Sequence, residues 1–121
     1  MSTSKHRHYE VIYLAQHKSS EEGRAALAER LKNTVEGTFG GELVKAESWG
    51  DRRLAYEIKI GAERHTKAHY EYLVVKGPAN MTHELERILR LNELCIRFLT
   101  IKLDAYDASV VVNVPTDIME A

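Results

Sequence analysis

The basic side chains best placed for chemistry in this sequence are those that could hold the phosphates of a nucleic acid. A guanidinium offers two parallel N–H donors, which match two phosphate oxygens. Arg52 and Arg53 are adjacent, so on a strand they point to opposite faces unless the chain twists at Gly50. One of them is expected to reach phosphate or a partner protein, and the other to pair with Asp51 or Glu47. The predicted phosphate contacts are Arg52, Arg53, Arg90, Arg97 and Lys102.

Histidine and cysteine, by contrast, form no pattern that a metal or a catalytic mechanism needs. On one strand His65 and His69 would share a face but lie about 13 Å apart, too far for a common metal. Cys95 is the single cysteine, which excludes an internal disulfide and fits a small buried hydrophobe in a reducing compartment. The sequence has no phosphate-binding glycine loop, no nucleophile elbow and no convincing pair of carboxylates with a neighbouring base. We therefore expect no metal, no cofactor, no small-molecule substrate and no enzymatic activity.

Length and composition are those of one soluble domain of 121 residues. No apolar run approaches the length that spans a membrane. The first eight residues are polar and contain no apolar signal core, so secretion is not expected and a cytoplasmic location is.

The net charge of −1 conceals an uneven distribution. Residues 104–121 carry four acidic and no basic side chains, so the remainder has 17 basic and 14 acidic residues. A body with a charge of +3 can hold phosphates on a local patch, but it lacks the strong field of a self-sufficient nucleic-acid binder. The acidic tail is equally consistent with a segment that only aids solubility.

The elements that must position these residues follow a repeated strand–helix–strand pattern. The run at 8–14 (HYEVIYL) is echoed at 69–75 (HYEYLVV), and each is followed by an amphipathic helical stretch and another strand. This pattern predicts a sandwich of four strands and two helices. Both helices must cover the same face of the sheet, so the other face is expected to carry the function.

The boundaries of these elements have recognisable signals. Ser19 and Glu22 have the spacing of a capping box for a first helix that ends near Gly37, and Asn80 is a plausible cap for a second helix after Pro78. The strands are predicted at 8–15, 42–60, 69–76 and 96–103, with a bend at Gly50 and a turn over 61–66. If the second and third strands form a hairpin, the first and third strands are central in the sheet.

Side-chain alternation assigns the faces of the last strand. Ile96, Phe98 and Thr100 share one face, whereas Arg97, Leu99 and Ile101 share the other. Because an arginine does not belong beneath a helix, the face of Arg97, Leu99 and Ile101 is expected to be the free one.

The sequence also resembles a known family over roughly residues 8–103. Residues 47–58 (ESWGDRRLAYEI) are similar to a signature of the sixth protein of the bacterial small ribosomal subunit. Tyr9-Glu10, residues 67–70 (KAHY), 90–93 (RLNE) and 96–100 (IRFLT) agree with it, in order and in register. The chain departs from the family at Glu57, where proline is usual, and after residue 103, where no similarity is found.

The resemblance implies a ferredoxin-like βαββαβ fold, an α+β class, in residues 1–103, and a protein without enzymatic activity. It further implies a structural component of the small ribosomal subunit that binds the central domain of the ribosomal RNA together with the eighteenth small-subunit protein. It places Tyr70 and Tyr72 on the free face as contacts for a partner protein, with Leu99 and Ile101. Packing of these tyrosines at the edge of the core remains an equal alternative. The ribosome could be bacterial or organellar.

Two other functions remain open. An RNA-recognition module has the same strand order and stacks bases on aromatic side chains, for which Tyr13, Tyr70 and Tyr72 are available, but its third-strand signature is missing. A ligand-sensing domain of the same fold would form a symmetric dimer with a saturable small ligand, and no motif favours it.

The segment 104–121 forms an acidic and apolar tail. Its run of Val110, Val111 and Val112 would be an aggregation hazard if left exposed. We expect these valines to lie extended on a partner protein and residues 108–115 to be disordered in the isolated protein.

Overall fold

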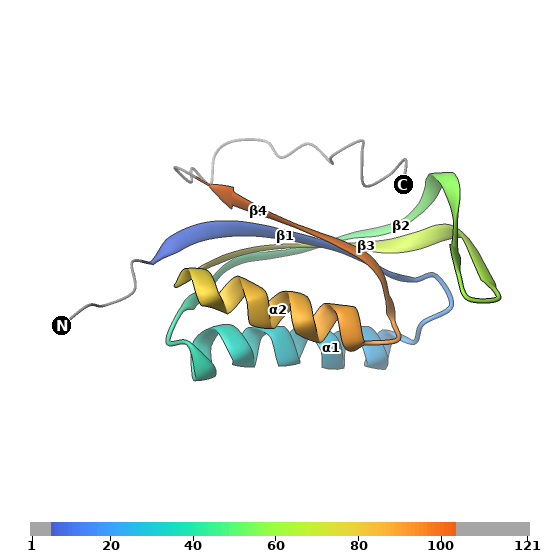
Figure 1. The fold of residues 1–121 in the computed structure, drawn as a ribbon. Coiled ribbons are helices and arrows are strands. Elements are labelled where there is room, and N and C mark those ends of the chain that lie inside the picture. The colour runs from blue at the N-terminus through green and yellow to red at the C-terminus, as the bar shows by residue number, and fades with distance from the viewer. Residues whose placement is uncertain (1–5, 104–121) are drawn as a thin grey trace.

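The structure is a computed structural model that describes residues 6–103. Four antiparallel strands form one sheet in the order β2-β3-β1-β4, and both helices lie on the same face of it (Figure 1). The predicted ferredoxin-like sandwich is therefore confirmed, as is the central position of the first and third strands. The elements are β1 (Arg7–Gln16), α1 (Glu21–Asn33), a wide helical turn η1 (Thr34–Thr38), β2 (Glu42–Ile60), β3 (Glu63–Gly77), α2 (Ala79–Leu91) and β4 (Cys95–Leu103).

Both helices begin one or two residues away from the predicted caps. Ser20, not Ser19, caps α1, because its hydroxyl accepts the backbone N–H of Gly23 at 2.9 Å. Ser19 instead donates its hydroxyl to the backbone oxygen of Gln16, which fixes the turn before the helix. α2 starts directly after Pro78, so the prediction of Asn80 as its cap is wrong. Proline is tolerated here because the first backbone N–H groups of a helix have no intrahelical acceptor, so the missing N–H of proline loses no hydrogen bond.

Two glycines make the exit from α1 possible. Gly40 has a φ of +63°, a conformation that side chains disfavour. Gly41 lies so close to β3 that a Cβ atom there would approach the backbone oxygen of Lys76 to 2.3 Å. The chain can therefore leave η1 and enter β2 beside the end of β3.

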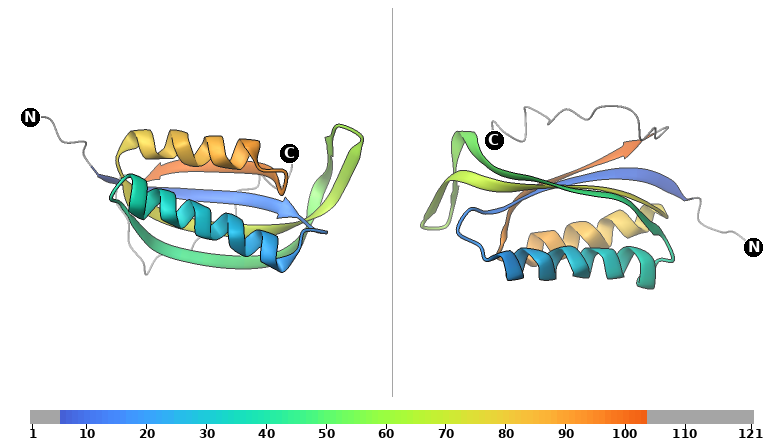
Figure 2. Two further views of the ribbon diagram at one scale, coloured as in Figure 1. Left: turned by 90° about the horizontal axis from the view of Figure 1, so that it is seen from below. Right: turned by 180° about the vertical axis from the view of Figure 1, so that it is seen from behind.

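The hairpin of β2 and β3 is longer and tighter than predicted. Only residues 61 and 62 separate the strands, with Gly61 at a φ of +62°, so the predicted turn over 61–66 is too long. The register shifts between Ser48 and Gly50, as expected, and again between Arg53 and Ile58. Beyond these shifts the hairpin projects past the helices as an arm (Figure 2).

The sheet carries an apolar layer on each face. On the helix side Tyr9, Val11 and Tyr13 of β1 pack with the stripes of α1 and α2, among them Leu31 and Leu85. The opposite layer contains Ile12, Leu14, Leu54, Ile58, Ala68, Tyr70, Tyr72, Val74 and Ile96. Within residues 6–103, no helix is long and apolar enough to cross a membrane.

Candidate nucleic-acid and partner interface

The sheet face opposite the helices, here called the helix-free face, is built from alternate residues of the four strands. In register, Leu14 of β1 lies between Tyr70 of β3 and Arg97 of β4. One step along, Ile12 lies between Tyr72 and Leu99. Because paired residues point to the same side of a sheet, these side chains form continuous rows across it.

The structure thus places the tyrosines of the third strand on the helix-free face, but it buries them. Tyr70 and Tyr72 are both 0% exposed. Trp49 of β2 stacks on Tyr72 with 4.9 Å between the ring centroids and 13° between the ring planes. The Tyr72 hydroxyl donates to the carboxylate of Glu10. The partner contact predicted for Tyr70 and Tyr72 thus becomes a supporting role beneath other side chains.

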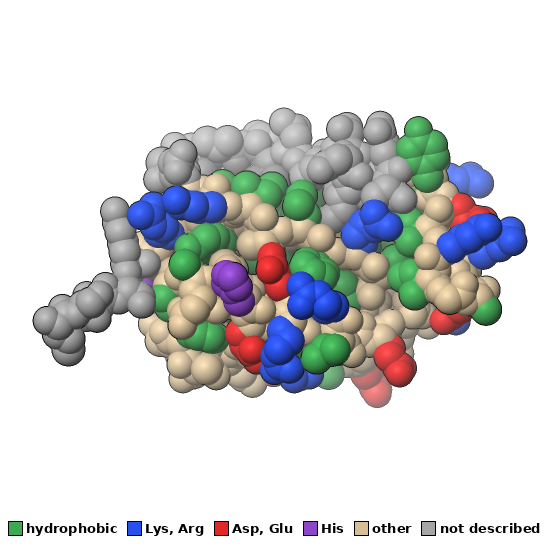
Figure 3. Space-filling model, viewed as in Figure 1, with side chains coloured by type: hydrophobic (Ala, Val, Ile, Leu, Met, Phe, Trp, Pro, Cys, Tyr) green, Lys and Arg blue, Asp and Glu red, His purple; other side chains and the backbone are tan. Residues whose placement is uncertain are grey.

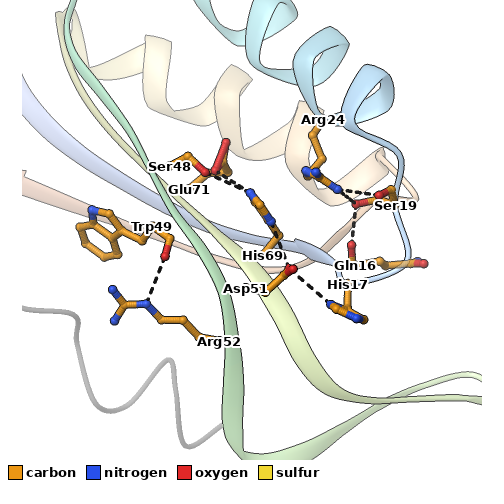
Figure 4. A network of polar contacts seen from close by, with 10 residues as sticks. All are labelled: Gln16, His17, Ser19, Arg24, Ser48, Trp49, Asp51, Arg52, His69 and Glu71. Atoms are coloured by element: carbon orange, nitrogen blue, oxygen red, sulfur yellow. Dashed lines mark hydrogen bonds and ion pairs between the residues drawn. The ribbon is translucent and has the colours of Figure 1, made fainter.

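Arg52 is the cation that lies above this aromatic group. Its guanidinium carbon is 5.7 Å from the ring centroids of both Trp49 and Tyr70, within the range of a cation–π interaction. Its Nε donates to the backbone oxygen of Trp49 at 3.4 Å (Figure 4). Burial raises the pKa of the Tyr70 hydroxyl, and the charge of Arg52 partly offsets that effect. Arg52 remains exposed, so its donors can reach a ligand over the helix-free face.

Arg53 points to the other side of the hairpin, as predicted for adjacent residues on a strand. Arg52 is opposite Ala68, which belongs to the helix-free layer, whereas Arg53 is opposite Lys67. The predicted ion pair of one arginine with Asp51 or Glu47 is wrong. Within residues 6–103, Asp51 is held by two histidines, and Glu47 pairs with a lysine at 3.7 Å.

The side chains of β4 point to the two faces of the sheet as predicted, except at the start of the strand. Arg97, Leu99 and Ile101 lie opposite Leu14, Ile12 and Glu10 of the helix-free face. The predicted grouping of Ile96 with Phe98 and Thr100 is wrong, because Ile96 packs in the helix-free layer. A register shift between Leu14 and Ala15 explains the change, since it inserts one residue into β4 and reverses the alternation before it.

Two of the predicted phosphate contacts meet in one hollow. Arg90, at the end of α2, and Arg97, near the start of β4, both line a cavity of about 360 Å³. The guanidinium carbon of Arg90 lies 5.7 Å from the ring centroid of Phe98. The remaining walls are apolar and are formed by Ile60, Leu89, Cys95, Ile96 and Phe98. This arrangement offers two guanidinium groups beside an apolar surface, which suits a phosphate with its attached nucleoside.

The predicted basic residues therefore do not form one patch. Lys102 is opposite Tyr9, on the helix side of the sheet, and is exposed. Arg52 lies over the helix-free face, Arg53 faces away from it, and only Arg90 and Arg97 share a hollow. In the space-filling view the lysine and arginine side chains lie in separate groups with acidic side chains between them (Figure 3). Reasoning from the sequence missed the role of Trp49, although a lone tryptophan beside an expected bend was a usable signal.

Comparisons with known proteins agree with this architecture. The model of the family "Ribosomal protein S6" matches residues 8–102. Small ribosomal subunit protein bS6 of Agrobacterium fabrum is 38% identical over 99 residues, which are 82% of this chain and 61% of that protein. The protein of the same name from Afipia carboxidovorans is 38% identical over 97 residues, 80% of this chain and 64% of that one. The chain thus spans about six tenths of the length of these relatives.

A solved structure gives the same result. The crystal structure of 30S ribosomal protein S6 from Thermotoga maritima superimposes with a TM-score of 0.72 at 30% sequence identity. The match covers 82% of this chain and 89% of that one. With the fold, the residues matched and these relatives in agreement, the chain belongs to the ribosomal protein S6 family.

Proposed function

We propose that this protein is a structural component of the small ribosomal subunit that binds the central domain of the ribosomal RNA jointly with the eighteenth small-subunit protein. Membership of the ribosomal protein S6 family supports the ribosomal role. Its place of action would then be the ribosome, in the cytoplasm or in an organelle. No catalytic activity is part of this proposal.

The hollow of Arg90 and Arg97 is the single observation that carries RNA binding. Two guanidinium groups from different elements converge on one cavity of about 360 Å³ with an apolar wall. Each could donate two hydrogen bonds to a phosphate, while Phe98 and Ile60 contact the attached sugar or base. Because the basic groups are few and separated, the affinity of the protein alone should be low, and a second protein is needed to complete the site.

We assign contact with that second protein to the helix-free face. Trp49 and Arg52 lie over this face, and the half-buried Leu99 and Ile101 border it. Aromatic residues and arginine are enriched where protein surfaces associate. The partner contacts proposed for Val110, Val111 and Val112, and the acidic tail itself, lie outside the described residues and remain part of this proposal.

Burial of the tyrosines disfavours an RNA-recognition module. Such a module stacks bases directly on the exposed aromatics of its central strands. Here Tyr70 and Tyr72 are fully buried and Trp49 occupies the ring face of Tyr72. Bases could not stack on these rings without displacing Trp49 and Arg52.

A gel-shift assay with a central-domain RNA fragment tests the proposal, with and without the eighteenth small-subunit protein from the same source. We expect weak binding alone and strong binding of the mixture. Arg90→Ala and Arg97→Ala should each weaken RNA binding by the mixture. Each should also reduce the slope of log K against log salt concentration by about 0.7–0.9 per lost phosphate contact. Arg87→Ala is the matched control, because Arg87 lies on the same helix but is paired with Glu84 at 2.6 Å.

Two outcomes would overturn the proposal. Tight binding to short single-stranded RNA without a partner would instead favour the RNA-recognition function. Failure of both the protein and the mixture to bind RNA would remove the ribosomal role, and a symmetric dimer with a saturable small ligand would then point to a sensing domain.

A further inference from the structure

A second hollow lies on the helix side of the sheet, away from the residues assigned above. It is open between α1 and the edge of the sheet formed by β2 and β3 and has a volume of about 330 Å³. α1 contributes two small side chains, Ala25 and Ala28, which leave the space unfilled. The other lining residues are polar: Glu21, Arg24, Ser48, His69 and Glu71. The space is large enough for one long side chain.

The carboxylate of Glu71 is the least satisfied group of this hollow. Its Oε2 is buried and has no hydrogen-bond partner among the described residues. The Nε2 of His69 lies 3.6 Å from this oxygen, which is too long for a hydrogen bond. A buried carboxylate oxygen without a hydrogen-bond donor is energetically unfavourable, so a bound group that donates a hydrogen bond to this oxygen would be stabilised.

His69 cannot be that donor in its neutral form, because both ring nitrogens are already engaged (Figure 4). Its Nδ1 lies 3.1 Å from Oδ1 of Asp51, and an ionised carboxylate only accepts, so Nδ1 carries the proton. Its Nε2 lies 3.0 Å from Oγ of Ser48 and then accepts the serine proton. In this neutral form the imidazole directs no proton toward Glu71.

The neighbouring hydroxyl of Tyr13 does not satisfy Glu71 either. Tyr13 is 1% exposed, and its hydroxyl has no hydrogen-bond partner among the described residues. Burial first, and the negative charge of Glu71 second, raise the pKa of Tyr13, so the hydroxyl stays neutral. Within residues 6–103, Tyr13 and Glu71 thus each have a buried oxygen without a hydrogen-bond partner, and Glu71 lines the hollow.

The charges at the mouth favour a cation. Glu21 and Glu71 are acidic, and among residues 6–103 Arg24 is the one formally charged basic residue that lines the hollow. The Nη1 of Arg24 donates to the backbone oxygen of Ser19 at 2.5 Å and to its Oγ at 3.2 Å (Figure 4), so it is held toward the turn before α1. RNA phosphate would be repelled by the carboxylates, whereas a cationic side chain would be attracted.

The order Ser48–His69–Asp51 also occurs in serine hydrolases, but the surroundings oppose that chemistry. Acyl transfer develops negative charge on the substrate oxygen, and such sites place donors there. In this hollow the carboxylate of Glu71 lies beside the same imidazole nitrogen and would repel that charge. The arrangement is better suited to accept hydrogen bonds from a cation.

We infer that this hollow binds the guanidinium or ammonium group of a side chain from a basic protein partner, with Glu71 and Ser48 as its acceptors. The position beside β2 supports this, because β2 is an edge strand, so a protein that contacts the helix-free face can also reach this hollow around that edge. The identity of the partner as the eighteenth small-subunit protein rests on the proposed function, whereas binding of a cationic side chain does not.

Nuclear magnetic resonance titration of the full chain with N-acetyl-L-arginine amide tests the hollow by itself. We expect millimolar binding with shifts of the amides of Ser48, His69 and Glu71, and no comparable shifts with N-acetyl-L-leucine amide. Glu71→Gln removes the charge and Ala28→Leu fills the space, and each should weaken binding at least fivefold. Ala26→Leu is the matched control, because Ala26 is an exposed residue of the same helix that does not line the hollow. Thermal unfolding of each variant verifies that it is folded.

The second part of the experiment measures association with the eighteenth small-subunit protein by calorimetry, without RNA. We expect Ala28→Leu to raise Kd at least tenfold and Ala26→Leu to leave it unchanged. Arginine amide shifts that are insensitive to Glu71→Gln and Ala28→Leu would show a hollow filled by water alone and would overturn the inference. An unchanged Kd for Ala28→Leu would overturn the assignment of the hollow to a side chain of that protein. If neither wild type nor variant binds that protein while the amide titration succeeds, the proposed function fails and the cation site stands.

Discussion

Replacement of Trp49 by alanine tests whether the aromatic group on the helix-free face stabilises the fold. The change removes the ring that stacks on Tyr72 at 4.9 Å and the ring beneath Arg52 at 5.7 Å. A stacked aromatic pair contributes about 0.5–1.5 kcal/mol beyond the area it buries, and an exposed cation–π contact about 0.5–1 kcal/mol. Because Trp49 is only half-buried, we expect a loss of about 2 kcal/mol in the free energy of unfolding, below the range for a fully buried tryptophan.

Urea unfolding followed by far-ultraviolet circular dichroism measures this loss without depending on the tryptophan signal. Trp49→Phe keeps an aromatic ring in place and should cost less than about 1 kcal/mol. A double-mutant cycle with Tyr72→Leu isolates the pair, because the lost hydrogen bond to Glu10 cancels between the two arms. We expect a coupling of about 0.5–1.5 kcal/mol. A loss below about 0.5 kcal/mol together with zero coupling would refute the stabilising role of the stack.

Three further predictions concern the rest of the domain. Gly41→Ala places a Cβ 2.3 Å from the backbone oxygen of Lys76 and should lower the free energy of unfolding in urea by about 1–3 kcal/mol. Gly37→Ala is the control and should not destabilise the protein, because a Cβ at Gly37 meets no atom within 4 Å. Equal losses for the two variants would contradict the close approach at Gly41. Burial raises the pKa of the Cys95 thiol to about 12. Iodoacetamide at pH 8 should therefore label the native protein at least about 100-fold more slowly than the unfolded chain, because the thiolate is the reactive form. Similar labelling rates would show that the native protein has an accessible thiolate. Hydrogen bonds from neighbouring imidazoles hold the pKa of Asp51 below its usual range, so the unfolded chain binds the proton more tightly. Stability should fall as the pH drops below about 4, and Asp51→Asn should flatten that fall in urea midpoints measured from pH 3 to 6.

The arm of β2 and β3 shows where prediction from the sequence loses accuracy. Alternation along 42–60 and the glycine at 50 indicated a long strand with a bend, and the structure has both. The length of the turn could not be read, because residues 61–66 are polar and polar residues occupy exposed strands as readily as turns. Pairing of Glu63 with Ile60 decides that β3 begins earlier than its apolar residues suggest.

The types of residue in the candidate site could be predicted from the sequence, but which of these residues lie close together could be predicted less well. Arg90 and Arg97 are seven residues apart on different elements, and only the packing of α2 beside β4 places them in one hollow. Trp49 and Tyr72 are neighbours because the register of β2 shifts before Gly50, and no local signal fixes the extent of that shift.

The sequence by itself determined the order of the elements, the faces of the last strand from Arg97 onward and the resemblance to a family, because these depend on periodicity and on short motifs. The tertiary structure alone decided which side chains are accessible. Tyr70 and Tyr72 lie on the predicted face, yet Trp49 and Arg52 lie over them. It also decided that Glu71, an ordinary acidic residue of a strand, faces the helices with a buried oxygen and no hydrogen-bond partner among the described residues. Burial and partner geometry arise from contacts between residues distant in the chain, and local patterns do not encode them.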